Sequence, residues 1–80
     1  MRVEVRLYAT FAEFAPTHGA GDPFHVELEP TATLTNLIGK LGIPASEVHL
    51  CIVNGRPIHH HALRLREADR VGLFPPVGGG

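Results

Sequence analysis

Apolar and polar residues alternate in two places near the start of the chain. Every second residue is apolar from Val3 to Leu7 and again from Phe24 to Leu28. A period of two places the apolar side chains of a strand on one face and leaves the other face to water. Two such strands so close in sequence predict a hairpin.

The segment between these strands predicts a short helix and a loop. Thr10 is a candidate N-cap before the apolar residues of 11–15, and Pro16 ends the segment after one or two turns. Residues 17–23 are rich in Gly, Asp and Pro, a composition typical of loops.

The clearest helix signal covers residues 34–41. Its apolar residues have the spacing i, i+3, i+4 and i+7, which makes one stripe: Leu34, Leu37, Ile38 and Leu41. Thr33 is the predicted N-cap, and Gly42 is the predicted left-handed residue after the helix. Gly39 inside the helix costs up to about 1 kcal/mol relative to alanine, so we expect another segment of backbone to pack closely against it.

Three more strands are predicted after the helix. Leu50–Val53 is apolar throughout, so we expect this strand to be buried on both faces. Asn54-Gly55 favours a type I′ hairpin turn, because both positions accept a positive φ, and Pro57-Ile58 opens the returning strand. Residues 67–69 resemble a polar turn before a last strand over 71–74. Strands in runs around one helix indicate an α+β fold.

Length and composition exclude several classes of protein. A chain of 80 residues, 44% hydrophobic and 19% charged, is one small globular domain. A net charge of −1 gives no strong attraction to nucleic acid or to an acidic membrane. No apolar run approaches the ~20 residues of a spanning helix, and the first residues lack the apolar block of a signal peptide. With one cysteine, an internal disulfide is impossible, so we expect a soluble protein of the cytoplasm.

Residues 75–80 form a tail behind a predicted domain of residues 1–74. Pro75-Pro76 favours extended geometry and cannot donate hydrogen bonds to a sheet. Val77 and three glycines follow, with almost nothing to bury. One interpretation is a frayed end. The other is a thin, flexible chain end that threads a narrow tunnel and presents its carboxylate to an active site, while the prolines hold it away from the domain.

Three stretches of the chain carry a family resemblance. They are the Asn54-Gly55 turn after an apolar strand, the stretch Leu65–Phe74, and the ending Phe-Pro-Pro-Val-Gly-Gly-Gly of residues 74–80. They are similar to the ubiquitin-like sulfur carriers of the MoaD/ThiS family, and the ending most resembles the small subunit of molybdopterin synthase. The resemblance covers essentially the whole chain. It implies a β-grasp fold, in which one main helix packs across a mixed sheet of about five strands and a flexible tail follows.

A second resemblance concerns the middle of the chain. Residues 41–55 are also similar to ubiquitin-like modules that are fused to a predicted nuclease-type domain. Such modules lack a free Gly-Gly end, so the tail argues against this relative and favours the sulfur carriers.

The resemblance to sulfur carriers implies a carrier protein and not an enzyme. An E1-like adenylyltransferase would use ATP to adenylate the C-terminal carboxylate of Gly80, and a persulfide sulfur donor would convert it to a thiocarboxylate. The sulfur would go to molybdopterin, with the large catalytic subunit of molybdopterin synthase as partner. The chain itself is expected to bind no cofactor and no metal. The residues expected to contact the partners are Phe74, Pro75, Pro76, Val77, Gly78 and Gly79.

A docking face is also expected on the sheet. If the last strand turns Val71 and Leu73 toward the helix, Phe74 points from the other face and is a candidate anchor for a partner. The alternative is that Phe74 closes the core. Three arginines of the predicted strands would share the outward face and attract an acidic partner, or simply be solvated there: Arg2, Arg6 and Arg70.

For other residues that could carry chemistry, the sequence favours a structural role over a functional one. Alternate histidines of His59–His61 would share one face of a strand, but no further ligand joins them, so we expect a polar loop and no metal. Cys51 lies among apolar residues, where a thiol behaves as a small hydrophobe. No glycine-rich phosphate loop precedes a helix, and the basic residues are scattered, so we expect no nucleotide or nucleic-acid site.

The destination of the sulfur and the use of the tail leave alternatives open. The sulfur could go to the thiazole of thiamine or to a tRNA base. The terminal glycine could instead form an isopeptide bond, as in a ubiquitin-like protein modifier. The domain could also be a non-covalent adaptor with an idle tail.

Overall fold

The computed structural model describes residues 1–76. In chain order the elements are β1 (Arg2–Leu7), the 3₁₀ helix η1 (Ala9–Phe14), β2 (Phe24–Glu27), α1 (Leu34–Leu41), the 3₁₀ helix η2 (Ala45–Glu47), β3 (Leu50–Val53), β4 (Arg56–Ile58) and β5 (Arg70–Phe74). Within the described residues, five strands and one α-helix thus follow the predicted order.

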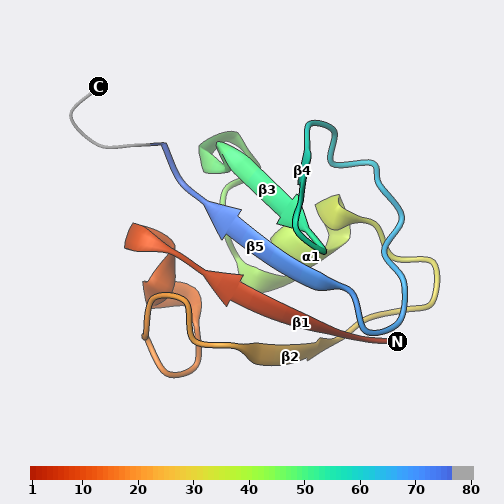
Figure 1. Cartoon of the computed structure of the whole chain (residues 1–80), viewed down its shortest axis with the longest axis horizontal. Coiled ribbons are helices and arrows are strands. Elements are labelled where there is room, and N and C mark those ends of the chain that lie inside the picture. The colour runs from red at the N-terminus through yellow and green to blue at the C-terminus, as the bar shows by residue number, and fades with distance from the viewer. Residues whose placement is uncertain (77–80) are drawn as a thin grey trace.

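The strands form one mixed sheet in the order β2-β1-β5-β3-β4 (Figure 1). The central strands β1 and β5 are parallel, with Glu4 opposite Arg70 and Leu7 opposite Leu73. The other three pairings are antiparallel, including the predicted hairpin of β1 and β2. The prediction of an α+β fold with a mixed sheet of five strands is confirmed.

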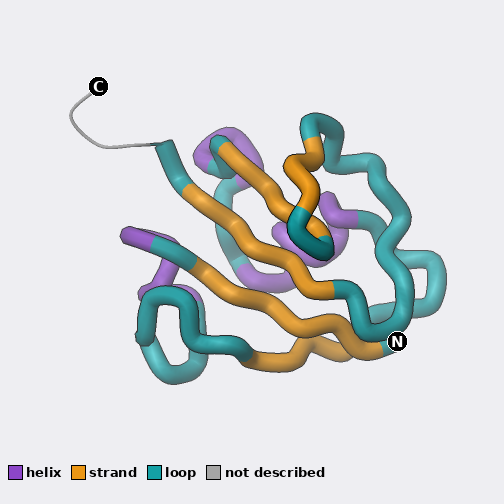
Figure 2. The backbone as a smooth tube through the Cα atoms, in the orientation of Figure 1, coloured by secondary structure: helices purple, strands orange, loops and turns teal. Residues whose placement is uncertain are grey.

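The core lies between the sheet and α1, which crosses one face of the sheet (Figure 2). The alternation of β1 turns Val3, Val5 and Leu7 toward this core, where none of them retains exposed surface. The stripe of α1 meets them with Leu34, Leu37 and Ile38, all buried: burying such a side chain stabilises the fold by about 1.5–3 kcal/mol.

Both ends of α1 are capped as predicted. The Thr33 hydroxyl accepts a hydrogen bond from the Asn36 backbone N–H, and the Asn36 side chain accepts one from the Thr33 backbone N–H, which completes a capping box. Gly42 has a φ of 81° in the left-handed region. The expectation for Gly39 was wrong, because it is exposed and a Cβ built there would meet nothing within 4 Å.

Two further expectations need correction. β3 is buried on one face only, because Cys51 and Val53 face the core while Leu50 and Ile52 are half-buried on the other side. Its uniformly apolar sequence therefore reflects an apolar outer surface and not burial on two sides. The segment after β1 is a 3₁₀ helix with Tyr8 at its N-cap position, so Thr10 lies inside it and caps nothing.

The Asn54-Gly55 turn joins β3 to β4 with φ values of 52° and 82°, as the I′ prediction requires. The Asn54 side chain also reaches the polar turn before β5. Its Nδ2 donates to Asp69 Oδ1 at 2.8 Å, and its Oδ1 accepts from the Arg70 backbone N–H at 2.9 Å. The hairpin is therefore tied to the central strand by side-chain hydrogen bonds.

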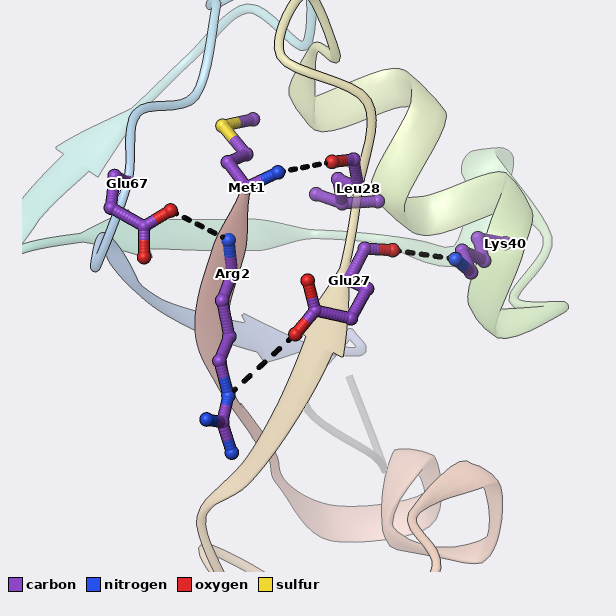
Figure 3. A network of polar contacts seen from close by, with 6 residues as sticks. All are labelled: Met1, Arg2, Glu27, Leu28, Lys40 and Glu67. Carbon is purple, nitrogen blue, oxygen red and sulfur yellow. Dashed lines mark hydrogen bonds and ion pairs between the residues drawn. The ribbon is translucent and has the colours of Figure 1, made fainter.

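Polar contacts link the start of β1, the end of β2 and α1 (Figure 3). The Met1 ammonium donates to the Leu28 carbonyl at 2.5 Å, and Lys40 Nζ donates to the Glu27 carbonyl. The Arg2 backbone N–H donates to the Glu67 carboxylate at 2.9 Å. Because β1 and β5 are parallel, this network lies at the opposite end of the sheet from Phe74. The end of β5 is therefore clear of this network.

No helix of residues 1–76 is long and apolar enough to cross a membrane.

Candidate functional site

The candidate site is on the outer face of the sheet, which points away from α1. Along β5, Val71 and Leu73 are buried in the core. The alternating residues Gly72 and Phe74 therefore lie on the outer face. On β3, Ile52 is opposite Gly72. We call Tyr8, Ile52, Gly72 and Phe74 the outer patch: all four are half-buried, and three of them are large and apolar or aromatic.

Phe74 and Tyr8 form a stacked pair in this patch. Their ring centroids are 4.3 Å apart, and the planes differ by 3°. Phe74 thus lies on the outer face, as one of the two predicted alternatives has it, and the interpretation that it closes the core is wrong because Leu73 fills that place. Aromatic pairs of this kind contribute about 0.5–1.5 kcal/mol beyond their buried area.

A shallow groove of ≈ 330 Å³ runs along the patch. Gly72 forms part of its lining and adds no side chain there, and charged residues border it: Glu4, Arg6 and Arg70. Arg6 Nε lies 3.5 Å from Glu4 Oε2, whereas the ion pairs found within residues 1–76 do not involve Arg70. The groove therefore combines an apolar end with a basic border, a surface suited to an apolar segment that carries acidic residues.

The prediction that three arginines share the outward face is confirmed. Arg2 and Arg6 alternate with Glu4 on the outer side of β1, and Arg70 is opposite Glu4 on β5. Arg2 and Arg70 also line one shallow depression beside Glu67. The charges of Arg2 and Arg6 are partly balanced by Glu27 and Glu4 of the same face.

The root of the tail leaves the sheet at this patch. β5 ends at Phe74, whose carbonyl accepts a hydrogen bond of 2.9 Å from the His49 backbone N–H. Pro75 is half-buried and Pro76 is exposed. The remaining predicted site residues lie outside the described residues: Val77, Gly78, Gly79 and Gly80. Of the predicted partner-binding set, the structure thus places Phe74, Pro75 and Pro76 together, beside the groove.

The histidine run does not have the geometry that a strand would give it. β4 ends at Ile58, so His59–His61 follow the strand and do not alternate along it. Of these three, His61 Nε2 lies 3.5 Å from Cys51 Sγ. The described part of the chain contains no group of three or more His, Cys, Asp or Glu side chains able to hold a metal ion.

Cys51 lies next to His61, but it is withdrawn from solvent. It is buried in the core, and burial raises the pKa of its thiol above the ordinary value. A raised pKa keeps the sulfur protonated at neutral pH, and the thiolate is the nucleophile. The geometry therefore favours the packing role that the sequence predicts.

Of the outer patch, only Phe74 was among the predicted site residues, and Tyr8 is the most informative of the three members that the prediction overlooked. The alternating pattern of β1 continues through it, because Tyr8 follows Arg6 on the outer side. A second signal was Gly72 within a strand, since a glycine there leaves room for a neighbouring ring. What the sequence does not show is that β1 and β5 are neighbours.

The fold is that of a ubiquitin-like β-grasp protein: one helix crosses a mixed sheet whose two central strands are parallel, and a tail follows the last strand. The same type of fold is found in molybdopterin converting factor subunit 1 and small archaeal modifier protein 1. Comparison with family models places the chain further. The model of the Mut7-C ubiquitin family matches residues 1–77, and the chain belongs to that family.

Solved structures show the same fold. A putative molybdopterin converting factor subunit 1 from Pyrococcus furiosus is 26% identical, with a TM-score of 0.71 over 96% of this chain and 99% of that one. A crystal structure of small archaeal modifier protein 1 from Haloferax volcanii is 26% identical, with a TM-score of 0.68 over 95% of this chain and 98% of that one. In the complex of subunits 1 and 2 of the molybdopterin-converting factor from Helicobacter pylori, the matched chain is 25% identical, with a TM-score of 0.64 over the whole of both chains. No curated protein gave a significant match.

The family match corrects one inference from the tail. The glycine ending argued against ubiquitin-like modules fused to a nuclease-type domain and for the sulfur carriers. The matched region ends at residue 77, before Gly78–Gly80, so these glycines do not exclude membership of a family described as Mut7-C ubiquitin. The resemblance to the small subunit of molybdopterin synthase is supported independently by the solved structures.

Proposed function

We propose that the chain is a sulfur carrier, with Gly80 as its terminal residue and molybdopterin as the destination of the sulfur. The observation that carries this proposal is the position of Phe74: the central strand ends on the outer face, beside an apolar groove, and the sequence continues as Pro-Pro-Val-Gly-Gly-Gly. A partner that docks on the groove would therefore also receive the tail. The likeness to two molybdopterin converting factor subunits supports the same proposal.

The proposed chemistry needs activation, because a carboxylate is a poor electrophile. A Gly80 carboxylate oxygen bonds to the α-phosphorus of ATP while the bond to pyrophosphate breaks. The terminal sulfur of a persulfide then attacks the acyl carbon, and AMP leaves with the electron pair of the broken C–O bond. A thiol of the partner attacks the resulting acyl disulfide, so that a thiocarboxylate leaves and a disulfide remains on the partner.

In this scheme the chain supplies recognition, and the partners supply the catalytic groups. The ATP belongs to an E1-like adenylyltransferase, and we propose no cofactor for the chain itself. The outer patch would be buried against each partner in turn, with Phe74 as the aromatic anchor and Tyr8 stacked on its ring. The basic border of the groove would favour partners with acidic residues opposite Arg6 and Arg70. The complex of subunits 1 and 2 from Helicobacter pylori supports a larger catalytic subunit as one such partner.

A protein modifier is the second candidate, and the likeness to small archaeal modifier protein 1 favours it. Both functions share the adenylate on Gly80. They differ in the nucleophile that follows: a persulfide sulfur gives the thiocarboxylate, whereas a lysine amine gives an isopeptide bond.

The intact mass of the protein distinguishes these candidates. The chain is incubated with ATP, the E1-like enzyme of the same organism and a persulfide donor, and a variant without Gly79 and Gly80 is the matched control. A sulfur carrier gains the mass of one oxygen-for-sulfur exchange, which the variant does not gain. An unchanged mass in the complete reaction contradicts the proposal. Gly-Gly remnants on lysines of cellular proteins identify a modifier. If neither the thiocarboxylate nor these remnants are detected, a non-covalent adaptor is the remaining function.

The destination of the sulfur needs a second assay. The thiocarboxylated chain is mixed with the large subunit of molybdopterin synthase and the molybdopterin precursor, and formation of the dithiolene is followed. If the sulfur is transferred only to a thiazole precursor or to tRNA in parallel reactions, the molybdopterin assignment is wrong although the carrier function stands.

A further inference from the structure

Tyr8 occupies a slot whose shape matches its ring. Phe74 covers one face of the ring in the stack at 4.3 Å. A Cβ on Gly72 would lie 3.4 Å from Tyr8 Cε2, and a Cβ on Gly21 would lie 3.3 Å from Tyr8 Cε1. Glycines therefore border the ring at two places from different parts of the chain. A Cβ alone on Gly72 would be in van der Waals contact with the ring, but a larger side chain at either glycine would compete with the ring for space.

The backbone of Tyr8 is held as firmly as its ring. Its N–H donates to the Leu73 carbonyl at 3.2 Å, and its carbonyl accepts from the Phe11 N–H at 3.0 Å. The next residue, Ala9, has a φ of 52°, a left-handed conformation that residues with a Cβ disfavour. Such conformations persist only where the surroundings hold them, and here they turn the chain sharply after Tyr8.

Through the stack, Tyr8 also holds the last residue of β5. The Phe74 carbonyl is bound by the His49 N–H, and the Phe74 ring is bound by Tyr8, so both its main chain and its side chain are fixed. Pro75 follows with the restricted φ that its ring imposes. The direction in which the chain leaves the sheet is therefore determined at Phe74.

We infer that Tyr8 is a positioning residue, which sets the direction of the tail root so that Gly80 reaches the reactive centre of an activating enzyme docked on the outer patch. This inference rests on the proposed function. The reacting carboxylate lies six residues after Phe74, so the position at which Phe74 is held on the docked domain sets where the tail begins. Adenylation requires the carboxylate at the α-phosphorus in near-attack geometry, which small displacements disturb.

A positioning role differs measurably from simple docking. An anchor that binds equally in the ground state and the transition state changes KM when it is removed, whereas loss of alignment lowers kcat. The Tyr8 hydroxyl forms no hydrogen bond with the residues that the structure describes, so the ring alone is needed and phenylalanine should replace it.

The first test is ATP–pyrophosphate exchange by the E1-like enzyme at varied concentrations of the full chain. Tyr8→Leu keeps an apolar side chain but loses the stack, and we expect kcat to fall about tenfold with KM within about threefold. Tyr8→Phe should restore wild-type kcat. Phe24→Leu, which removes a half-buried aromatic ring from β2 at the sheet edge, is the matched control and should match the wild type. Wild-type kcat in Tyr8→Leu, or a rise in KM alone, overturns the inference.

The second test needs no partner. The ¹⁵N order parameter of the Phe74 amide should be about 0.85 in the wild type and in Tyr8→Phe, and should fall toward about 0.6 in Tyr8→Leu. An unchanged value in Tyr8→Leu shows that the stack does not fix the tail root and overturns the inference. If the enzyme never adenylates the wild type, the proposed function fails, and the order parameters alone decide whether Tyr8 holds the tail root.

Discussion

Two glycines at the end of α1 should respond to alanine in opposite directions. Gly39 lies in the helix with an exposed position, and a Cβ there meets no atom within 4 Å. Gly42 follows the helix with a φ of 81°, and its N–H donates to the Gly39 carbonyl at 3.1 Å. Space is available at both positions, so the difference between them is one of backbone conformation.

The magnitudes follow from this difference. Alanine is about 0.8–1.0 kcal/mol more favourable than glycine inside a helix, because glycine loses more backbone freedom on folding. Gly39→Ala should gain most of this, since no contact opposes it. Gly42→Ala keeps the left-handed conformation at a cost of about 1–2 kcal/mol, which outweighs the lower entropy of its unfolded state. In a domain of this size, 1 kcal/mol corresponds to about 4–8 °C in Tm.

Urea and thermal unfolding of the two variants check the prediction. Gly39→Ala should raise the midpoint and Tm by several degrees with an unchanged m value, and Gly42→Ala should lower both. The double variant should lie near the sum of the two changes if the sites act independently. A loss of stability in Gly39→Ala would refute the reasoning, because it would require a close neighbour at Gly39 that is not found among residues 1–76.

Three further predictions concern the site and the sheet. Gly72→Leu should displace the Tyr8 ring and fill the groove, so binding to the activating enzyme should weaken about tenfold or more in calorimetry, whereas Gly72→Ala, with its Cβ at ordinary contact distance, should bind like the wild type. Asn54→Asp replaces a donor to Asp69 by a second carboxylate, so it should cost about 1–2 kcal/mol in urea unfolding at pH 7 and low salt, and less at high salt, which screens the repulsion; an equal cost at both salt concentrations would exclude charge repulsion. Because burial raises the pKa of the Cys51 thiol, the unfolded chain loses this proton at a lower pH than the folded one, and stability should fall as the pH rises above about 8.5. Cys51→Ala should remove that slope, and a slope unchanged in this variant would assign it to other groups.

The local elements could be predicted because their signals lie within a few residues. Thr33 and Gly42 bracket a stripe with helical period, and both act as caps in the structure. Asn54-Gly55 accepts two positive φ values, and the hairpin turn forms there. Where a neighbour distant in sequence decided the outcome, prediction failed. The apolar run of β3 gave no sign that Ile52 faces outward, because its apolar neighbours on that face come from other strands.

The candidate site divides in the same way. The sequence showed the Phe-Pro-Pro root and three arginines with the right alternation for one face, and the structure confirms that face. It did not show the stack, because Tyr8 and Phe74 are brought together only by the parallel pairing of β1 with β5. A parallel pair formed across the length of the chain leaves no periodic trace in either strand.

By itself, the sequence determined which segments are strands and helix, where most of them end, and which side of the alternating strands faces the core. These properties depend on backbone preferences and on side chains a few residues apart. Only the tertiary structure decided the order of the strands, and with it the groove between Arg6, Gly72 and Phe74 and the ring of Tyr8 that holds the tail root. The reason is that strand order is selected by packing of the whole core against α1, a free energy to which all the strands contribute together.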